Sequence, residues 1–291
     1  MNILLTGRYG QVGWELQRTL LPLGRVHALG HRELDLADAA AVRRKLDELR
    51  PDVIVNAAAY TAVDKAEGEQ DLAHAVNAAA PALLAQEAAR RGALLIHYST
   101  DYVFDGAKAA PYVETDQTNP LGAYGRSKLT GEKGIRAAGA DHLIFRTSWV
   151  YAARGANFLR TILRLAAERE ELRIVADQVG APTWARLIAE ATAHALKQAQ
   201  QERRSGKFES GLFHLAAAGE TSWHGFASAI VAGRSGLRVK AVTPITTADY
   251  PLPAPRPANS RLNTDAFRAR FGLALPAWET CLRLCLEEIP Q

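Results

Sequence analysis

Residues 4–17 read LLTGRYGQVGWELQ, and this stretch decides the fold. Three glycines, Gly7, Gly10 and Gly13, follow a short apolar run and precede an amphipathic segment. Glycines at such a junction allow a tight turn, a close approach of the backbone to a pyrophosphate and close packing of helix on strand, while the helix N-terminus supplies unpaired N–H groups. The stretch therefore predicts a strand, a turn and a helix, and it favours dinucleotide binding over a plain turn.

Further apolar runs of strand length recur through the first half of the chain. Amphipathic segments separate them, such as 40–49 and 77–92, the second of which ends on Gly92 as a helix C-cap does. Strands that alternate with helices predict a parallel sheet covered on both faces. We therefore expect an α/β fold, a Rossmann-type doubly wound parallel sheet with a smaller C-terminal substrate-binding lobe. The expected strands lie at 2–6, 25–29, 52–59, 94–100 and 142–148.

The pattern changes near residue 150, where helix-rich sequence broken by prolines begins. We expect residues 1–150 to form the dinucleotide-binding Rossmann domain. Residues 151–291 should form mainly the substrate-binding lobe, with some segments returning to the first domain. The proline-rich stretch 243–262 predicts a long surface loop with a functional role, because proline interrupts helices and central strands. The polar stretch 196–211 predicts an exposed connection.

Composition excludes several classes of protein. Of the 291 residues, 48% are hydrophobic and 23% are charged, which excludes disorder of the whole chain. No apolar run approaches the length of a membrane span, and the N-terminus has no basic leader, so we expect a cytoplasmic protein. The net charge of +4 is scattered, which disfavours nucleic-acid binding and suits an anionic small molecule. Cys281 and Cys285 have helical spacing, which favours buried thiols over a disulfide.

Residues 124–128 read YGRSK and place Tyr124 and Lys128 on one face of a helix. An ammonium beside a phenol lowers the pKa of the phenol, so Tyr124 is a candidate proton donor. Thr100 and Asp101 follow the fourth expected strand, at the edge where open parallel sheets bind ligands. The hydroxyl of Thr100 could bond a substrate carbonyl that gains negative charge. Alone, so short a pattern as YxxxK would recur by chance, but here it stands behind the glycine-rich turn.

The end of the second expected strand normally carries the residue that reads the adenosine ribose. Here the sequence is LGHREL, with no acidic residue before Glu33, and Arg32 is available, with Arg8 as a second candidate. An arginine there favours NADPH, although two surface arginines without a ligand explain the pattern nearly as well. Asp35 and Leu36 come next, where an adenine ring could be bounded.

Together these features resemble the extended short-chain dehydrogenase/reductase superfamily and, within it, the dTDP-4-dehydrorhamnose reductase family. The resemblance extends from the N-terminus to about residue 264. It rests on the stretches MNILLTGRYGQVGWELQ, RPDVIVNAAAYTAVDKAE, HYSTDYVFDG, PLGAYGRSKLTGEK, FRTSWVYA, DQVGAPT and RPANSRLNT.

The resemblance implies NAD(P)H-dependent reduction of the C4 keto group of dTDP-4-dehydro-L-rhamnose, the last step of dTDP-rhamnose synthesis for cell-surface polysaccharide. It implies a catalytic set of Thr100, Tyr124 and Lys128, with Asp101 and Trp149 contacting the substrate together with Thr100. Without the resemblance, Trp149 is more simply a core aromatic. The residues implied around the cofactor, besides Tyr124 and Lys128, are Gly10, Gln11, Val12, Asp35, Leu36, Ala59, Tyr60, Thr61 and Tyr98.

The resemblance also implies a homodimer and Mg²⁺ bound by Glu15, Glu190 and Glu288 at a dimer contact, although each glutamate alone is more simply a surface residue. Two other functions stay open. One is a regulatory subunit that binds NADP without catalysis, which would be free to lose the catalytic set. The other is a nucleotide-sugar epimerase or dehydratase, which would retain NAD tightly. The sequence does not fix the nucleotide base, the sugar, the choice between NADPH and NADH or the oligomeric state.

Overall fold

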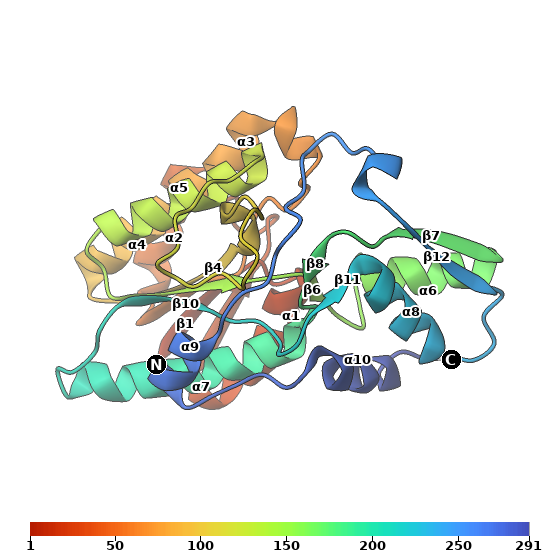
Figure 1. Cartoon of the computed structure of the whole chain (residues 1–291). Helices are drawn as coiled ribbons and strands as arrows, with labels where there is room; N and C mark the ends of the chain where they lie inside the picture. Colours follow the sequence, from red (N-terminus) through yellow and green to blue (C-terminus); the bar gives the residue numbers. More distant parts are fainter. Residues whose placement is uncertain (291) are drawn as a thin grey trace.

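A computed structural model describes residues 1–290 and contains a central sheet of six parallel strands (Figure 1). The strand order is β10-β5-β4-β3-β1-β2, so the first half of the chain supplies five neighbouring strands. This arrangement confirms the doubly wound parallel sheet. The strands are β1 (Asn2–Thr6), β2 (Arg25–Leu29), β3 (Val53–Asn56), β4 (Leu94–Thr100), β5 (His142–Thr147) and β10 (Gly211–His214).

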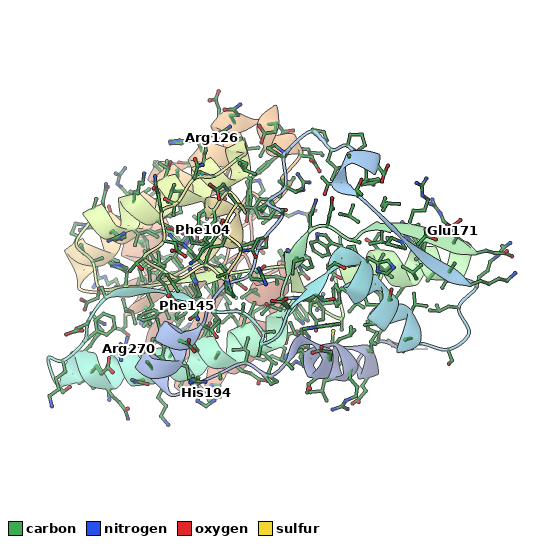
Figure 2. The ribbon with its side chains drawn as sticks, viewed as in Figure 1. Phe104, Arg126, Phe145, Glu171, His194 and Arg270 are labelled. Atoms are coloured by element: carbon green, nitrogen blue, oxygen red, sulfur yellow. The ribbon has the colours of Figure 1, made fainter. Side chains whose placement is uncertain are left out.

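Helices cover both faces of this sheet, as the apolar character of its central strands requires. In Figure 1, α1, α7 and α9 lie below the sheet and α2, α4 and α5 lie above it. Phe145 of β5, labelled in Figure 2, is fully buried and packs against Phe267 and Phe271 of α9. The bounds are α1 (Gln11–Thr19), α2 (Ala39–Leu49), α4 (Ala80–Arg91), α5 (Ala123–Ala137), α7 (Ala185–Arg204) and α9 (Asp265–Phe271).

The smaller group of elements lies beside the C-terminal edge of the sheet, to the right in Figure 1. Its own core includes Tyr151, Phe226 and Trp278. Glu171, labelled in Figure 2, starts the outlying strand β7 and is exposed. The larger elements are α6 (Phe158–Glu168), β7 (Glu171–Val175), α8 (Trp223–Ala232), β12 (Ala241–Ile245) and α10 (Trp278–Glu287).

Short elements complete the chain. The helix α3 (Gln70–His74) runs through a π-helical turn, Ala75–Ala79, into α4. Two short strand pairs join segments of the smaller group. These strands are β6 (Val150–Tyr151), β8 (Val179–Gly180), β9 (Thr183–Trp184) and β11 (Thr221–Ser222).

Two details differ from the sequence prediction. The stretch 196–211 is not wholly an exposed connection, because α7 continues to Arg204 and buries Leu196 and Ala199 against the sheet. The stretch 243–262 is not wholly a loop, because Pro244 lies within β12, which pairs in parallel with β7 in a two-stranded sheet. A two-stranded sheet has only edge strands, where proline is tolerated.

Two further predictions are confirmed. The helix α4 ends at Arg91, and Gly92 caps it in the left-handed conformation with φ +63°. Cys281 and Cys285 are both buried free thiols on α10. In the later part of the chain, β10 pairs with β5 and α7 packs under the same sheet. No helix within residues 1–290 is both long and apolar enough to cross a bilayer.

Candidate functional site

The catalytic candidates meet where β4 ends and α5 begins. Thr100 is the last residue of β4, and a 3₁₀ turn, Asp101–Val103, follows it. The ring of Tyr102 meets the ring of Tyr124 edge to face, with centroids 5.7 Å apart. The hydroxyl of Thr100 donates to Oδ1 of Asp101 at 3.1 Å and is near enough to the Tyr124 phenol to lower its pKa in part. The structure thus brings Thr100 and Tyr124 together, as the sequence predicts.

The residues between Tyr124 and Lys128 hold the start of α5 in place. A Cβ at Gly125 would lie 2.2 Å from the carbonyl oxygen of Tyr102, so only glycine lets the helix approach so closely. The hydroxyl of Ser127 donates to the carbonyl of Tyr124 at 2.8 Å and accepts from the amide of Asn77 at 3.0 Å. Gly125 and Ser127 therefore fix the position of the backbone that carries Tyr124.

The prediction that Lys128 lowers the pKa of Tyr124 is wrong for this arrangement of side chains. Burial raises the pKa of Tyr124 to about 12, the nearby hydroxyl of Thr100 offsets this in part, and the charge of Asp101 raises the pKa further. Lys128 does not lower that pKa, because its amine makes its hydrogen bonds to β4 and not to the phenol. Tyr124 is therefore a phenol that stays protonated at neutral pH.

Lys128 is only 1% exposed. Its Nζ donates to the carbonyl oxygen of Tyr98 at 2.6 Å and lies 3.1 Å from Nε2 of His97. Burial lowers the pKa of Lys128 to about 8, and the charge of Glu132 offsets this in part. The ring of Tyr98, a predicted cofactor residue, lies in the core with its hydroxyl 2.8 Å from Thr192 Oγ1. Tyr98 therefore meets Lys128 through its backbone.

Asp101 is buried beside Thr100, whose hydroxyl donates to its Oδ1 at 3.1 Å. Burial raises the pKa of Asp101 to about 6, and the nearby hydroxyls of Ser260, Thr100 and Ser148 offset part of this rise, although Oδ2 of Asp101 has no hydrogen-bond partner within residues 1–290. Sequence reasoning missed both serines. Ser148 follows β5, and Ser260 comes from the proline-rich loop, so this loop does reach the site.

Two glycine positions of the glycine-rich turn have no room for a side chain. Gly7 has φ +76°, and a Cβ there would lie 2.6 Å from the backbone nitrogen of Ala58. A Cβ at Gly13 would lie 2.1 Å from the carbonyl oxygen of Gly7. Gln11 donates to the carbonyl of Val150 at 3.3 Å, and within residues 1–290 its buried Oε1 has no hydrogen-bond partner. A bare backbone cradle at a helix N-terminus, beside an unsatisfied polar atom, fits the pyrophosphate of a dinucleotide.

Beyond β2, Glu33 folds back onto the end of the strand. Its carboxylate accepts the N–H of Gly30 at 2.9 Å and the hydroxyl of Tyr9 at 3.2 Å, and it lies 3.9 Å from the guanidinium of Arg8. A Cβ at Gly30 would lie 2.5 Å from the Tyr9 ring. Arg32 is exposed. Of the two candidate arginines, Arg8 is therefore the one held against the strand end.

The other predicted cofactor residues line the same edge of the sheet. Asp35 is exposed and accepts the N–H of Ala37, whereas Leu36 is buried in the core. The segment 59–61 follows β3, and the amide side chain of Asn77 bonds both the N–H and the carbonyl of Tyr60, at 2.8 and 2.9 Å. Val12, by contrast, packs against the core under the sheet.

Trp149 has a strained backbone, with φ +47°, which is rare for a residue with a side chain. Its indole stacks on that of Trp223, with centroids 3.6 Å apart and planes at 8°. A Cβ at Gly180 would lie 2.6 Å from the Trp149 indole. Since Thr147, two residues earlier, pairs in register with Thr100, Trp149 lies at the edge that carries the catalytic candidates. Sequence reasoning did not identify Trp223.

Of the three glutamates predicted to bind Mg²⁺, two form ion pairs with arginine and one is exposed. Arg186 lies between two of them, with its Nε 3.3 Å from Glu15 and a further ion pair to Glu288. Glu15 also pairs with Arg18, and Glu190 is exposed on α7. Residues 1–290 contain no group of three His, Cys, Asp or Glu arranged to hold a metal ion. A guanidinium thus occupies the space between Glu15 and Glu288.

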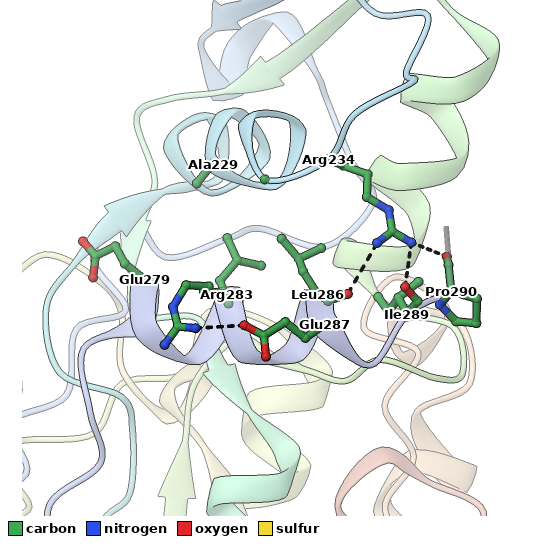
Figure 3. Close-up of a pocket in the computed structure, with 10 residues that line it drawn as sticks. Ala229, Arg234, Glu279, Arg283, Leu286, Glu287, Ile289 and Pro290 are labelled. Atoms are coloured by element: carbon green, nitrogen blue, oxygen red, sulfur yellow. Dashed lines mark hydrogen bonds and ion pairs between the residues drawn. The ribbon is translucent and has the colours of Figure 1, made fainter.

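A groove of about 550 Å³ lies elsewhere, between α8 and α10 (Figure 3). Arg283 and Glu287 form an ion pair of 2.8 Å on its floor, and Arg234 donates to the carbonyl of Ile289 at 2.7 Å. None of the residues that line it belongs to the predicted site. This groove is therefore separate from the catalytic candidates.

Comparison with known proteins identifies close relatives. The family model described as the RmlD substrate binding domain matches residues 1–290. A dTDP-4-dehydrorhamnose reductase of Burkholderia thailandensis is 55% identical over 295 residues, covering 99% of each chain. The Escherichia coli K12 protein of the same name is 48% identical over 297 residues, covering 99% of this chain and 98% of its own.

Solved structures agree with this. The dTDP-4-dehydrorhamnose reductase of Clostridium acetobutylicum superposes with a TM-score of 0.90 at 38% identity, covering 99% of both chains. That of Bacillus anthracis, in complex with NADP, gives 0.88 at 34% identity and 98% coverage of both. The UDP-glucose 4-epimerase of Thermus thermophilus, at 20% identity, covering 99% of this chain and 98% of its own with a TM-score of 0.81, shares the fold. From the whole-chain family match and these identities, the chain belongs to the dTDP-4-dehydrorhamnose reductase family.

Proposed function

We propose that this protein reduces the C4 keto group of dTDP-4-dehydro-L-rhamnose to dTDP-L-rhamnose with NAD(P)H, the last step of dTDP-rhamnose synthesis. The observation that carries the proposal is that Tyr124 lies beside Thr100 at the end of β4, while Lys128, one turn later on α5, bonds the same strand through the carbonyl of Tyr98. The names of the relatives and the NADP bound to the Bacillus anthracis protein support the same reaction.

When bound, the reduced dinucleotide would supply hydride to the C4 carbonyl carbon. Tyr124 would give the carbonyl oxygen its proton, which the phenol holds at neutral pH because its pKa is about 12. The tyrosinate left behind needs stabilisation, and the hydroxyl of Thr100, which donates to Asp101 before the reaction, would turn to donate to the phenolate. Thr100 would also orient the carbonyl, and Lys128 would hold the nicotinamide ribose. Asp101 and Trp149 would bind the sugar.

Preference for NADPH over NADH is a second part of the proposal. The support is the pair of arginines near the end of β2, because a guanidinium can bond a 2′-phosphate. Arg32 is exposed, so its side chain could reorient to contact such a phosphate, whereas Arg8 forms an ion pair with Glu33. The carboxylate of Glu33 should oppose the preference, since it would repel a phosphate and accept from a ribose hydroxyl.

The non-catalytic regulatory subunit is the second candidate, and retention of the whole catalytic set argues against it. The epimerase or dehydratase alternative is supported only by a shared fold at low identity. The homodimer and Mg²⁺ at a dimer contact stay predictions that follow from the family resemblance, and the cytoplasmic location stays a prediction from the composition of the sequence.

The decisive test is an absorbance assay of NADPH oxidation with the dTDP-4-keto sugar, comparing wild type with Tyr124→Phe. We expect the variant to bind NADPH normally but to turn over roughly two to four orders of magnitude more slowly, the usual range for loss of a general acid. Tyr151→Phe is the matched control, because the buried hydroxyl of Tyr151 has no hydrogen-bond partner within residues 1–290. Wild-type turnover by Tyr124→Phe, or no oxidation by the wild type, would reject the proposal.

A further inference from the structure

A buried line of polar side chains runs from the first strand to Lys128. Thr6, Asn56 and His97 occupy paired positions on the neighbouring strands β1, β3 and β4. All three are at most 2% exposed. Nδ1 of His97 lies 3.0 Å from the side-chain nitrogen of Asn56, and Nε2 lies 3.1 Å from Nζ of Lys128. The imidazole thus bridges β3 and the amine of Lys128.

The orientation of the Asn56 amide follows from its neighbours. The backbone N–H of Ala58 can only donate, and it lies 3.3 Å from Asn56 Oδ1. The hydroxyl of Thr6 donates to the same oxygen at 2.7 Å. The amide nitrogen therefore faces His97, and since an amide NH₂ only donates, Nδ1 of His97 must be the unprotonated acceptor.

The position of the remaining imidazole proton follows in turn. Burial, and then the charge of Lys128, lower the pKa of His97 well below its usual range, so the ring is neutral. A neutral imidazole carries one N–H, which here must be on Nε2, the atom facing Lys128. An ammonium has no lone pair to accept this N–H, whereas a neutral amine has one. The amine can still donate to the carbonyl of Tyr98.

We propose that Asn56 fixes His97 in the tautomer that presents an N–H to Lys128, and that this contact favours the neutral amine of Lys128 over the ammonium. His97 is thus a positioning residue that acts through Lys128. The inference rests on the proposed function only in the role given to Lys128, which is to hold the cofactor ribose. Where the Lys128 amine is neutral, at pH values above about 8, binding of NADPH should then be coupled to uptake of a proton from solvent by this amine.

The other ionisable groups near Lys128 either favour its ammonium form or are themselves neutral. Glu132, one turn further along α5, favours the ammonium. Its carboxylate is held by both sides of the Arg146 guanidinium from β5, at 2.9 and 2.7 Å, which weakens its effect. Tyr124 and Tyr98 stay neutral at working pH because burial raises the pKa of each phenol. The imidazole N–H is therefore the group facing Lys128 that a single substitution can change from a hydrogen-bond donor to an acceptor.

Two substitutions reverse this contact in different ways. In His97→Gln, the amide oxygen can turn towards Lys128 and accept from an ammonium. In Asn56→Asp, the carboxylate can only accept a hydrogen bond, so His97 carries its proton on Nδ1. The lone pair of Nε2 then faces Lys128. The matched control is His142→Gln, since His142 is another buried histidine but stands at the amino end of β5, where its Nδ1 lies 2.8 Å from the carbonyl of Ala140.

The first measurement is the tautomer of His97 in the wild-type protein, by long-range ¹H–¹⁵N correlation NMR, with the signal assigned by its loss in His97→Gln. We expect a neutral ring with its proton on Nε2 across the pH range from about 6 to about 9. A ring protonated on Nδ1, or charged near pH 6, would overturn the proposal even if neither variant folded.

The second measurement is the dissociation constant of NADPH, titrated by nicotinamide fluorescence as a function of pH. We expect affinity to fall as pH rises through the pKa of Lys128, near 8, by up to about tenfold per pH unit. In His97→Gln and Asn56→Asp this fall should begin about one pH unit higher, and in His142→Gln it should not move. A fall that stays in place or moves lower in both variants would contradict the proposal. Normal NADPH binding without sugar reduction would instead reject the proposed function alone.

Discussion

Replacing Asp101 by asparagine should stabilise the protein and damage its function. The carboxyl of Asp101 is 3% exposed, and burial raises its pKa from 3.8 to about 6. A rise of about two units corresponds to about 3 kcal/mol of unfavourable free energy in the ionised form. Asparagine removes this charge, but its amide NH₂ would meet hydroxyls that now face the carboxylate, and a buried donor left without an acceptor costs about 1 to 2 kcal/mol. At neutral pH we expect a net gain of about 1 to 2 kcal/mol.

The sign of the pH dependence follows from proton binding. Between about pH 4 and about pH 6 the native state holds the Asp101 proton more tightly than the unfolded chain does, so stability is full below this window and is lost as pH rises through it. The wild type should therefore show a decline that Asp101→Asn lacks. Asp71→Asn, at an exposed position on α3, should keep the wild-type decline.

Urea unfolding between about pH 4 and about pH 7 measures both effects, and thermal unfolding should show a gain of about 2 to 4 °C at neutral pH. The same variant should raise KM for the sugar by roughly tenfold to a hundredfold, since Asp101 is expected to contact it. If Asp101→Asn were no more stable than wild type at neutral pH and declined with the same slope, the carboxyl would not carry the burial penalty inferred here.

Three further substitutions test other parts of the site. Lys128→Met should weaken NADPH binding and lower turnover by roughly a hundredfold or more, and an unchanged dissociation constant would remove its role at the ribose. Arg32→Ala should raise KM for NADPH about fivefold to tenfold and leave that for NADH unchanged, an effect that should shrink with added salt; equal loss with both cofactors would argue against a phosphate contact. Gly180→Ala should push the Trp149 indole aside, because the new Cβ would lie 2.6 Å from it, and should raise KM for the sugar about tenfold with less effect on kcat; steady-state kinetics with wild-type KM would show that the indole is not needed there.

The strands were predictable because buried parallel strands are largely apolar runs, and the runs at 2–6 and 94–100 match β1 and β4 residue for residue. The C-terminal end of α7 was not predictable from the sequence, because its last turns bury only Leu196 and Ala199. The other residues there are polar, and Ser205 and Gly206 follow. Tertiary packing against the sheet decided that local conformation, and a sequence pattern does not contain it.

The site divides in the same way. The spacing of Tyr124 and Lys128 predicts a shared helix face, but not that the amine turns to His97 and Tyr98. A lone histidine inside an apolar strand is weak evidence of function, and Asn56 becomes its partner only through the register of β3 and β4. Polar residues inside the otherwise apolar runs DVIVN and LLIHYST were the one local signal available.

The late return of β10 to the sheet has a consequence for biosynthesis. About 60 residues separate the end of β5 at Thr147 from the start of β10 at Gly211. At about 5 to 20 residues per second, a ribosome needs roughly 3 to 12 seconds to add them. Throughout that interval the edge of β5 has no neighbour, and the apolar underside awaits α7. An unpaired strand edge is a template for aggregation, so the nascent chain should depend on chaperones, and a fragment ending at residue 150 should be insoluble.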